Sequence, residues 1–491
     1  MTDHAPPTLE QIDACVAGGP FTDSWTSLSG YRVPEWYRRM KFGIFIHWGV
    51  YSVPAFGNEW YPRNMYMQGS PEFRHHVETY GPHRNFGYKD FIPMFRAERF
   101  DPEAWATLFS RSGARYVVPV AEHHDGFQMY KSAISHWNAY EMGPKRDVLG
   151  ELCAACRSRG LVMGASSHRL EHWFFMGHGK EFDSDIRDPL EKGDLYWPSM
   201  QEPEWHDIDG VPAPSREYFE DWLMRTCELI DRYHPSVLYF DWWIEHGAAK
   251  PWIKKLAAWY YNTAAARGEQ VVINYKHDAF LFGTAVPDVE RGQFAGIKPY
   301  VWQTDTSVAR NSWCYTEGND YKTPEELIWN LVDVVSKNGN FLLNIGPRAD
   351  GTIPDEDAQI LNEIGAWLDV NGEAIYDTVP WRSFGEGPTQ VEEGQFSDGE
   401  APRYTSSDFR FTAKGDALYV TAMKCSQDGA YCVRALGELD ASRKANFHGI
   451  IRDVRLLGSD AAVAWSRDGA GLHLHVPARS AKPLVFKLTL D

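Results

Sequence analysis

Short apolar runs of strand length alternate with helical patterns from about residue 40 to residue 370, and this alternation constrains the fold more than any other feature. The predicted strands are FGIFIHW (42–48), RYVVPVA (115–121), LVMGAS (161–166), VLYFD (237–241), QVVINY (270–275), YVWQTD (300–305) and FLLNIG (341–346). Continuous apolar strands that are separated by helices indicate a parallel sheet with helices on both faces.

Seven such strands fit a (β/α)8-like TIM barrel better than an open, doubly wound sheet. A dinucleotide-binding sheet would carry a GxGxxG motif after a strand, and neither that motif nor a phosphate-binding loop occurs in the sequence. The eighth strand is not recognisable from the pattern, and the long insert 171–215 has no clear period. We therefore expect a catalytic (β/α) barrel over residues 1–375.

Two helices near the end of this region are predicted in more detail. The segment TPEELIWNLVDVVSKNG has apolar residues three and four positions apart, after a Thr323 cap with Glu326 three residues further on. Gly339 is the expected residue in the left-handed conformation that ends this helix. The segment 355–372 repeats the same apolar spacing.

The sequence changes in character after about residue 378, where Gly, Pro, Ser and Glu become frequent. The short alternating strands that follow are DFRFTA, ALYVTAM, YCVRAL, DVRLLG, AAVAWS, GLHLHVP and LVFKLTL. Turn residues separate several of them, which is typical of an antiparallel β-sandwich. We expect this second domain to cover residues 376–491.

The composition excludes some classes of partner. A formal net charge of −18 argues against nucleic acid or an anionic membrane surface, because both attract basic patches. No run of about 18 apolar residues is present, so we expect no membrane span. Seven scattered cysteines suggest reduced thiols, and the N-terminal residues lack the pattern of a secretory signal. We expect a cytoplasmic protein, although a chain from which a signal had been removed would look the same.

Polar and titratable residues gather where the predicted strands end. In a barrel, the carboxyl ends of the strands share one rim, and function belongs there. The residues in question are His47, Glu122 to Asp125, Ser167 to Arg169, Asp241, Lys276 to Asp278, and Asp305. One such residue is usually a cap or a satisfied core group, but several on the same rim indicate a shared active site.

Two chemistries are disfavoured by the residue spacing. His47, His123 and His124 are metal-ligand types, but His123 and His124 are adjacent and would point to opposite faces of a strand. These three histidines form no HxH or HExxH spacing, so we expect no bound metal and no other cofactor. No GxSxG motif is present, and Cys153 and Cys156 lie in a helical pattern that directs them to the core.

Glycoside hydrolysis by two carboxylates remains, and Asp241 is its natural nucleophile. A retaining glycosidase needs one carboxylate nucleophile and one carboxylic acid, about 5–5.5 Å apart. Asp241 ends a rigid strand between Phe240 and the pair Trp242 and Trp243. Such an aromatic wall excludes water and strengthens the attraction of the carboxylate for an oxocarbenium-like transition state.

Several motifs together resemble the retaining α-L-fucosidases of glycoside hydrolase family 29. They are WYRRMKFGIFIHWGVYSVPAFGNEWYPRNMY (36–66), EHHDGF (122–127), LYFD (238–241), DVERGQ (288–293), SWCY (312–315) and NGNFLLNIGPRADGTIP (338–354). The resemblance covers residues 30 to 375 in order, and its first and last motifs are long and specific. It implies the same barrel, and the C-terminal segment is similar in kind to the β-sandwich of that family.

The resemblance also implies roles for individual residues. Asp241 would attack the anomeric carbon, while Glu290 with Arg291 beside it would form the acid/base position. Glu245, four residues past Asp241, is the competing acid/base candidate. The residues expected to contact the sugar are His47, Glu59, Trp60, His123, His124, Trp242 and Arg291. His168, Glu171 and His172 are left open between the site and structural support.

The resemblance implies hydrolysis of a terminal α-L-fucosyl residue on an oligosaccharide or glycoconjugate. The 6-methyl group of fucose needs an apolar patch, for which Phe42, Phe240 or Trp302 are candidates. The alternatives are a non-catalytic sugar-binding protein, a metal-dependent hydrolase, and a relative that acts on α-L-galactosides. A neighbouring subunit could complete the rim, so a homo-oligomer also stays open. Asp241 is followed by two tryptophans where many relatives have glycine.

Overall fold

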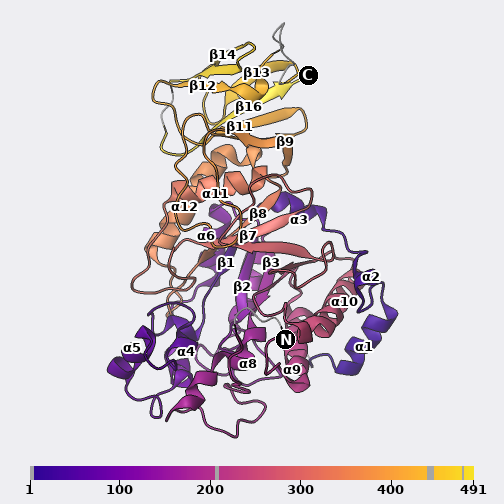
Figure 1. Cartoon of the computed structure of the whole chain (residues 1–491), viewed down its shortest axis with the longest axis vertical. Coiled ribbons are helices and arrows are strands. Elements are labelled where there is room, and N and C mark those ends of the chain that lie inside the picture. The colour runs from indigo at the N-terminus through magenta and orange to yellow at the C-terminus, as the bar shows by residue number, and fades with distance from the viewer. Residues whose placement is uncertain (1–4, 205–208, 439–446, 478–479) are drawn as a thin grey trace.

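The computed structural model describes residues 5–204, 209–438, 447–477 and 480–491. Its central feature is a closed parallel barrel in which each strand pairs with the next in sequence and β8 pairs with β1 (Figure 1). The barrel strands are β1 (Phe42–Ile46), β2 (Tyr116–Glu122), β3 (Val162–Ser167), β4 (Val237–Phe240), β5 (Val272–Tyr275), β6 (Val286–Glu290), β7 (Trp302–Ser307) and β8 (Gly339–Ile345). The predicted TIM barrel is confirmed.

Helices surround the barrel and fill the connections between its strands. The α-helices are α1 (Leu9–Gly18), α2 (Trp25–Leu28), α3 (Glu35–Met40), α4 (Tyr61–Asn64), α5 (Pro71–Tyr80), α6 (Pro102–Arg111), α7 (Val148–Ser158), α8 (His172–Phe175), α9 (Arg216–Tyr233), α10 (Lys250–Ala266), α11 (Pro324–Ser336) and α12 (Asp355–Asn371). The 3-10 helices are η1 (Val50–Ser52), η2 (Tyr88–Met94), η3 (Arg169–Glu171), η4 (Gly177–Glu181), η5 (Gly247–Ala249), η6 (Gly372–Ala374) and η7 (Arg434–Leu436).

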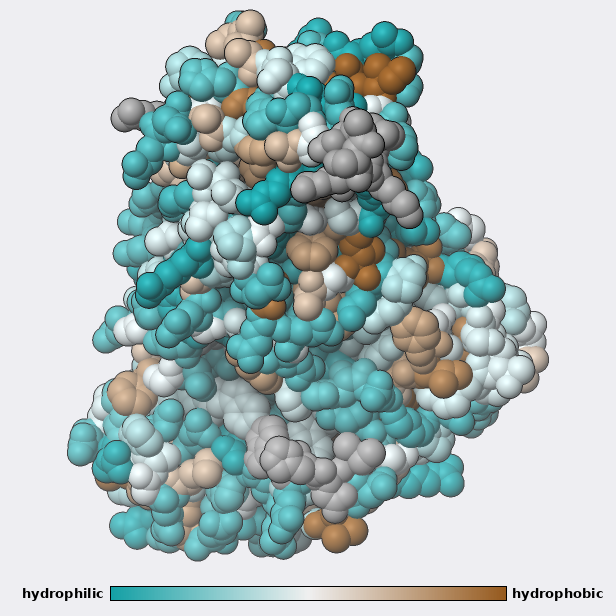
Figure 2. Space-filling model, turned by 45° about the horizontal axis from the view of Figure 1, so that its top comes forward, coloured by the Kyte–Doolittle hydropathy of each residue, from teal (hydrophilic) through white to brown (hydrophobic). Residues whose placement is uncertain are grey.

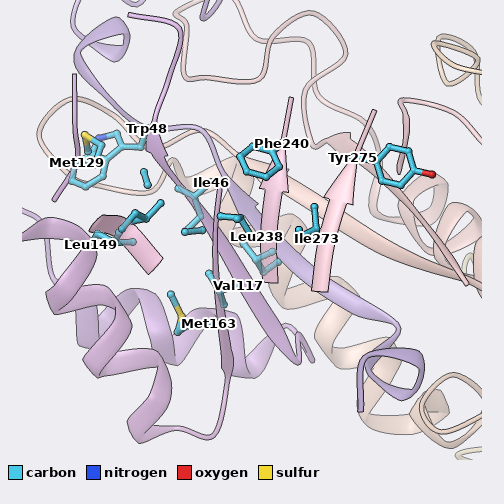
Figure 3. Packing of buried hydrophobic residues seen from close by; sticks show 14 of the residues in the cluster. Ile46, Trp48, Val117, Met129, Leu149, Met163, Leu238, Phe240, Ile273 and Tyr275 are labelled. Atoms are coloured by element: carbon cyan, nitrogen blue, oxygen red, sulfur yellow. The ribbon is translucent and has the colours of Figure 1, made fainter. Parts of the chain in front are cut away.

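Alternation along the strands separates two cores. Phe45 and Tyr239 belong to the cluster inside the barrel. Their strand neighbours Ile46, Leu238 and Phe240 point outward and pack in the cluster beneath the helices, which Figure 3 shows from close by. Because both faces of each strand are buried, the strands read as continuous apolar runs in the sequence.

Strand β6 is the one that the apolar pattern does not reveal. Its sequence, VPDVE, contains Pro287 and two acidic residues, yet it pairs with β5 and β7. Val286 lies in the inner cluster, so the alternation also turns Asp288 and Glu290 toward the barrel interior. Lys276 forms an ion pair with the buried carboxyl of Asp288, with its Nζ 2.6 Å from Oδ1.

Helix α11 begins as predicted and ends differently. The Thr323 side chain caps the backbone of Glu326, and the Glu326 side chain reaches back to form a capping box. Gly339 was the expected terminating residue, and that prediction is wrong. Asn338 adopts the left-handed conformation with a φ of 75°, and Gly339 is already the first residue of β8. Asparagine tolerates this conformation better than most residues.

The C-terminal segment folds into two antiparallel sheets. One has the order β13-β16-β11-β10-β9, and the other has the order β12-β15-β14. Their strands are β9 (Val379–Glu386), β10 (Phe409–Lys414), β11 (Ala417–Ala422), β12 (Ala430–Val433), β13 (Ile451–Leu456), β14 (Ala464–Arg467), β15 (Leu472–His475) and β16 (Leu484–Leu490). Both sheets contribute to one apolar core, in which Phe411 and Leu418 meet Leu472. Figure 1 shows these sheets (orange to yellow) beyond α11 and α12, at the opposite end from α4, α5 and α8.

The surface in view in Figure 2 is largely hydrophilic, and the described cysteines form no disulfides. In the part of the chain that the structure describes, no helix combines the length and apolar character that a bilayer crossing needs. Figure 2 shows a face dominated by hydrophilic residues, on which apolar side chains form small separate groups. None of the seven cysteines, which all lie in the described part of the chain, forms a disulfide, and Cys153 and Cys156 are buried in α7, as predicted.

Candidate active site

A cavity of about 540 Å³ opens at the carboxyl ends of the barrel strands. Most candidate residues from the sequence line it, together with several that were not predicted. The predicted residues among its walls are His47, Glu59, Trp60, His123, His124, His168, Asp241, Trp242 and Glu290. The rim that the strand ends define is therefore one continuous site.

Asp241 follows β4 directly and is held by two imidazoles. Nδ1 of His168 lies 2.8 Å from Oδ2 of Asp241, and Nε2 of His124 lies 3.4 Å from the same oxygen. Burial opposes ionisation of this carboxyl, but the two histidines outweigh burial and hold the pKa of Asp241 well below its usual range. The aspartate is therefore an ionised carboxylate in a largely buried position.

His168, which sequence reasoning left open, is thus placed against Asp241. Burial lowers the pKa of His168, so the ring is neutral near pH 7. A neutral ring that meets a carboxylate through Nδ1 carries its proton there, and Nε2 then accepts from the hydroxyl of Ser166, 3.0 Å away. The next residue, Arg169, is anchored by buried ion pairs to Glu122 and Asp221, which fixes the loop that carries His168.

His124 carries a positive charge at neutral pH. Burial opposes that charge, but Glu171 and Asp241 raise the pKa of His124 to about 9. Its Nδ1 donates to the backbone carbonyl of His168 at 2.9 Å, so Nε2–H faces Asp241. The cation beside the carboxylate stabilises the ionised form of the nucleophile candidate.

His47 and His123 are neutral, and their ring centroids lie 5.3 Å and 4.8 Å from that of His168. Burial lowers the pKa of both rings well below the usual range. His47 Nδ1 lies 2.7 Å from Oδ1 of Asn344, whose amide nitrogen donates to the Trp313 carbonyl; Nδ1 therefore carries the proton and Nε2 stays free to accept. Nδ1 of His123 is buried without a hydrogen-bond partner among the described residues. Nε2 of His47 can therefore accept from a sugar hydroxyl, and the His123 ring lines the same cavity.

The two adjacent histidines do not point to opposite faces of a strand, as the sequence suggested. Strand β2 ends at Glu122, so His123 and His124 lie in the loop that follows. Their ring centroids are 4.3 Å apart, and both rings line the cavity. The alternation rule applies only within the extended strand, which is why that argument was wrong.

Glu290 ends β6 and enters the same cavity as Asp241. Oε2 of Glu290 accepts a hydrogen bond from the indole Nε1 of Trp242 at 2.5 Å and lies 3.4 Å from Nζ of Lys276. Burial, helped by the charges of Asp241 and Asp305, raises the pKa of Glu290 to about 7 even though Lys276 opposes that shift. Glu290 can therefore hold a proton near neutral pH while Asp241 stays ionised.

Glu245, the competing acid/base candidate, lies elsewhere. Burial raises the pKa of Glu245 to about 7 as well, so its proton affinity does not distinguish it from Glu290. Glu245 is not among the described residues that line the cavity, whereas Glu290 is. The position of the side chain therefore favours Glu290 for proton transfer to a ligand in the cavity.

The turn after Asp241 accommodates two tryptophans in different ways. Trp243 has a φ of 73°, in the left-handed region that glycine prefers, and its ring packs 5.0 Å from that of Phe174. This packing holds a backbone conformation that costs about 1–3 kcal/mol for such a residue. The turn directs Trp242 toward Glu290. Trp243 thus stabilises the turn, and Trp242 donates a hydrogen bond within the site.

Glu59 and Trp60 line the cavity from the segment between β1 and α4. Oε2 of Glu59 accepts from the backbone N–H of Trp313 at 2.9 Å, and burial raises the pKa of this glutamate. The ring centroid of Trp60 lies 5.8 Å from that of His124. The guanidinium of Arg63 lies over the Trp60 ring, 5.3 Å from its centroid.

Arg291 was expected to contact the sugar, but the structure places it behind the wall. It is not one of the described residues lining the cavity. Its guanidinium lies 4.5 Å from the ring centroid of Trp313 and donates to the carbonyl of Ala309. The backbone of Arg291 has a φ of 43°, so the chain turns directly after Glu290 and carries the next side chain away from the opening.

The apolar part of the cavity comes from residues other than those predicted. Phe42, Phe240 and Trp302 all lie in the outer cluster beneath the helices, because they occupy outward positions of their strands. The inward positions belong to Phe45 and Tyr239, which line the cavity together with Trp313. Applying the strand alternation would have selected Phe45 and Tyr239 from the sequence.

Glu171 and His172 support the site from behind. Neither is among the described lining residues. Nδ1 of His172 donates to the His124 carbonyl at 2.6 Å, and burial lowers the pKa of His172 to about 3. Oε2 of Glu171 lies 3.4 Å from Nδ1 of His124, and burial raises the pKa of Glu171 to about 8.

Phe396 is the residue that sequence reasoning could not have found. It comes from the segment between β9 and β10, yet it lines the cavity beside Trp242. No motif or periodicity marks it, because the contact joins parts of the chain that are far apart in sequence.

Two sets of side chains bring possible metal-ligand atoms within 4.8 Å of one another in the described part of the chain. They are His47, His123 and His168, and His124, His168 and Asp241. His168 belongs to both sets, and its two ring nitrogens already meet Asp241 and Ser166. A metal ion would have to displace the hydrogen bonds that orient the carboxylate, so these sets fit a hydrogen-bonded sugar site better than a resident metal.

Comparisons with known proteins agree with this site. The family model described as Alpha-L-fucosidase matches residues 9–373. The tissue α-L-fucosidase of Rattus norvegicus is 32% identical over 456 residues, covering 91% of this chain and 86% of that protein. The plasma α-L-fucosidase of Homo sapiens is 34% identical over 377 residues, covering 74% and 73%.

Solved structures show the same architecture. The Thermotoga maritima α-fucosidase in complex with a mechanism-based inhibitor has a TM-score of 0.73 and 30% identity, covering 95% of this chain and 99% of that chain. The same enzyme in complex with fucose has a TM-score of 0.72, covering 95% and 100%. The chain therefore belongs to the α-L-fucosidase family, glycoside hydrolase family 29, and is a glycoside hydrolase.

Proposed function

We propose that the protein is a retaining exo-α-L-fucosidase that works by double displacement through a covalent glycosyl-enzyme. The observation that carries this proposal is a pair of carboxyl groups in one cavity with opposite proton affinities. The pKa of Asp241 lies well below its usual range, while that of Glu290 is raised to about 7. One group is thereby a nucleophile and the other an acid at the same pH.

In the first step, Asp241 attacks the anomeric carbon of a terminal fucosyl residue while protonated Glu290 donates to the glycosidic oxygen. The leaving group departs as an alcohol, and the sugar becomes an ester of Asp241. In the second step, ionised Glu290 removes a proton from water, which attacks the anomeric carbon and releases the carboxylate of Asp241. Two inversions give net retention, so α-L-fucose forms first.

The other polar residues of the cavity bind the sugar in this proposal. His47 offers Nε2 as an acceptor, and the His123 ring lines the same cavity. Glu59 and Trp60 contact the sugar from the segment between β1 and α4, while Phe45, Tyr239 and Trp313 surround its methyl group. The substrate is an oligosaccharide or glycoconjugate with a terminal α-L-fucosyl residue, as the fucose complex of the Thermotoga relative supports.

The test uses an activated aryl α-L-fucoside and added azide. Asp241→Ala should lower kcat by about 10⁴-fold or more, and azide entering from the vacated face should give β-fucosyl azide. Glu290→Ala should form the glycosyl-enzyme with this good leaving group and yield α-fucosyl azide. Glu245→Ala is the matched control, with wild-type products and no azide adduct.

Three outcomes would contradict the proposal. A wild-type rate for Asp241→Ala would remove this residue from the mechanism. Formation of the α-azide by Glu245→Ala instead of Glu290→Ala would transfer the acid/base role to Glu245. Loss of activity on treatment with a chelator would favour the metal-dependent alternative.

A further inference from the structure

A short segment of the chain beyond the barrel lies along the barrel rim, next to Glu290. Gly394 pairs with Gln293 as an antiparallel bridge, and its N–H donates to the Gln293 carbonyl at 2.9 Å. The N–H of Phe396 donates to the carbonyl of Glu290 at 2.9 Å, and that of Asp398 donates to the Arg291 carbonyl at 3.1 Å. The backbone of residues 394–398 is thereby fixed to the residues that carry the acid/base candidate.

The 394–398 segment and the residues after β6 approach each other so closely that residue 292 has no room for a side chain. A Cβ atom added to Gly292 would lie 1.8 Å from the carbonyl oxygen of Gly394, far inside van der Waals contact. Glycine is therefore required at position 292 by the neighbouring segment. This contact shows that the 394–398 segment packs directly against the barrel rim.

Asp398 anchors the far end of the segment through its side chain. Its carboxylate forms an ion pair with Lys322, whose side chain is 2% exposed, and accepts a hydrogen bond from the Thr306 hydroxyl. Arg291 adds a second cation 3.8 Å away. Because partly buried charges are costly unless paired, these contacts hold the segment in one position on the barrel.

The anchored segment presents one aromatic ring at the opening of the cavity. Phe396 is 55% exposed, and its φ of 54° lies in the left-handed region that phenylalanine rarely adopts. Its ring stacks on Trp242, with centroids 6.0 Å apart and planes inclined by 30°. Trp242 in turn donates to Glu290. An exposed ring on a fixed and strained backbone contributes little to the fold, which points to a ligand.

We infer that Phe396 forms the leaving-group side of the active site and stacks on the sugar ring that departs when the fucosyl bond breaks. This inference rests on the proposed function, because Glu290 as the acid must stand at the glycosidic oxygen. Trp242, which donates to Glu290, and Phe396, which stacks on Trp242, then face the leaving group. The flat ring of Phe396 suits the apolar C–H face of a sugar. The C-terminal part of the chain thereby contributes to substrate selection.

The test compares two substrates that differ only in the leaving group. A fucosyl disaccharide has a leaving sugar, and α-L-fucosyl fluoride has no ring to stack. Phe396→Ala should lower kcat/KM for the disaccharide about two- to tenfold more than for the fluoride. Phe396→Trp keeps a flat ring and should restore the preference. Phe282→Ala, in an exposed position that does not line the cavity, is the matched control.

A second measurement reports the same subsite after the first step. When a sugar acceptor competes with water for the glycosyl-enzyme, Phe396→Ala should lower the ratio of transfer to hydrolysis by a similar factor. Equal losses for the disaccharide and the fluoride, or no loss for either, would overturn the inference. A wild-type protein inactive on both substrates would instead refute the proposed function, so the two failures are distinguishable.

Discussion

The Nδ1–H of His168 donates a hydrogen bond to Oδ2 of Asp241 at 2.8 Å, and this contact explains how a buried carboxylate keeps its charge. Burial alone would favour the protonated acid, and a protonated aspartate is a poor nucleophile. The neutral imidazole supplies a donor without adding a buried charge, while His124 supplies the cation. The same hydrogen bond also fixes which carboxylate oxygen is occupied, so that Oδ1 remains for attack.

Replacing His168 by phenylalanine should therefore weaken the nucleophile without emptying the space it fills. Loss of a hydrogen bond to a charged group costs about 1.5–3 kcal/mol, so kcat/KM should fall about 10- to 100-fold. The pKa of Asp241 should rise, which moves the acid limb of the pH profile to higher pH. His136→Phe, in an exposed position, is the control. An unshifted acid limb in His168→Phe would show that His124 alone maintains the charge.

The pH dependence of the wild-type protein should be set by Glu290 on the alkaline side. The pKa of this glutamate is raised to about 7 by burial and by Asp241, and the acid must be protonated to assist the leaving group. For a fucosyl disaccharide, kcat/KM should fall about tenfold per pH unit above about pH 7. Asp241 should cause no loss on the acid side until well below its usual pKa of about 4. Fucosyl fluoride, which needs less protonic assistance, should show a weaker alkaline decline.

Trp242→Phe should move that alkaline limb in a defined direction. The indole N–H stabilises the ionised form of Glu290, so it lowers the pKa that burial raises. Removing the donor while keeping an aromatic ring should raise the pKa of Glu290 and extend activity to higher pH. The measurement is the pH profile of kcat/KM for the disaccharide, with Trp60→Phe as the aromatic control elsewhere in the cavity. A limb shifted to lower pH would contradict the assigned hydrogen bond.

Much of the barrel could be predicted because its strands are buried on both faces. Seven apolar runs located seven strands, and the polar residues at the ends of several runs located the rim, including Asp241 and His47. Strand β6 was not predicted because Asp288 and Glu290 interrupt its apolar pattern, and their burial depends on Lys276, which follows β5. A pattern within one segment does not contain the partner that makes a buried charge tolerable.

The details of the site depended on local geometry and on distant contacts. The end of β2 at Glu122 decides where the His123 ring points, and a turn at Arg291 decides that its guanidinium supports Trp313 from behind. Phe396 reaches the cavity only because the 394–398 segment pairs with the chain after β6. Neither the exact strand end nor such a pairing is encoded in residue spacing.

Glu171 gives a prediction about stability rather than rate. Both of its carboxylate oxygens are buried without a hydrogen-bond partner in the described part of the chain, and burial raises its pKa to about 8. The unfolded chain releases this proton near pH 4.5, so between pH 4.5 and pH 8 the folded state binds more protons than the unfolded state. The stabilising contribution is full below pH 4.5 and is lost as the pH rises through about 8.

Glu171→Gln removes this titration and keeps a side chain of similar shape. The midpoint of thermal unfolding should therefore fall less steeply between pH 5 and pH 8 than in the wild type, with the curves closest at the acid end. Glu98→Gln, in an exposed position, should follow the wild-type slope. Equal slopes for Glu171→Gln and the wild type would mean that Glu171 is already ionised in the folded protein, stabilised as an ion pair by the His124 cation 3.4 Å away.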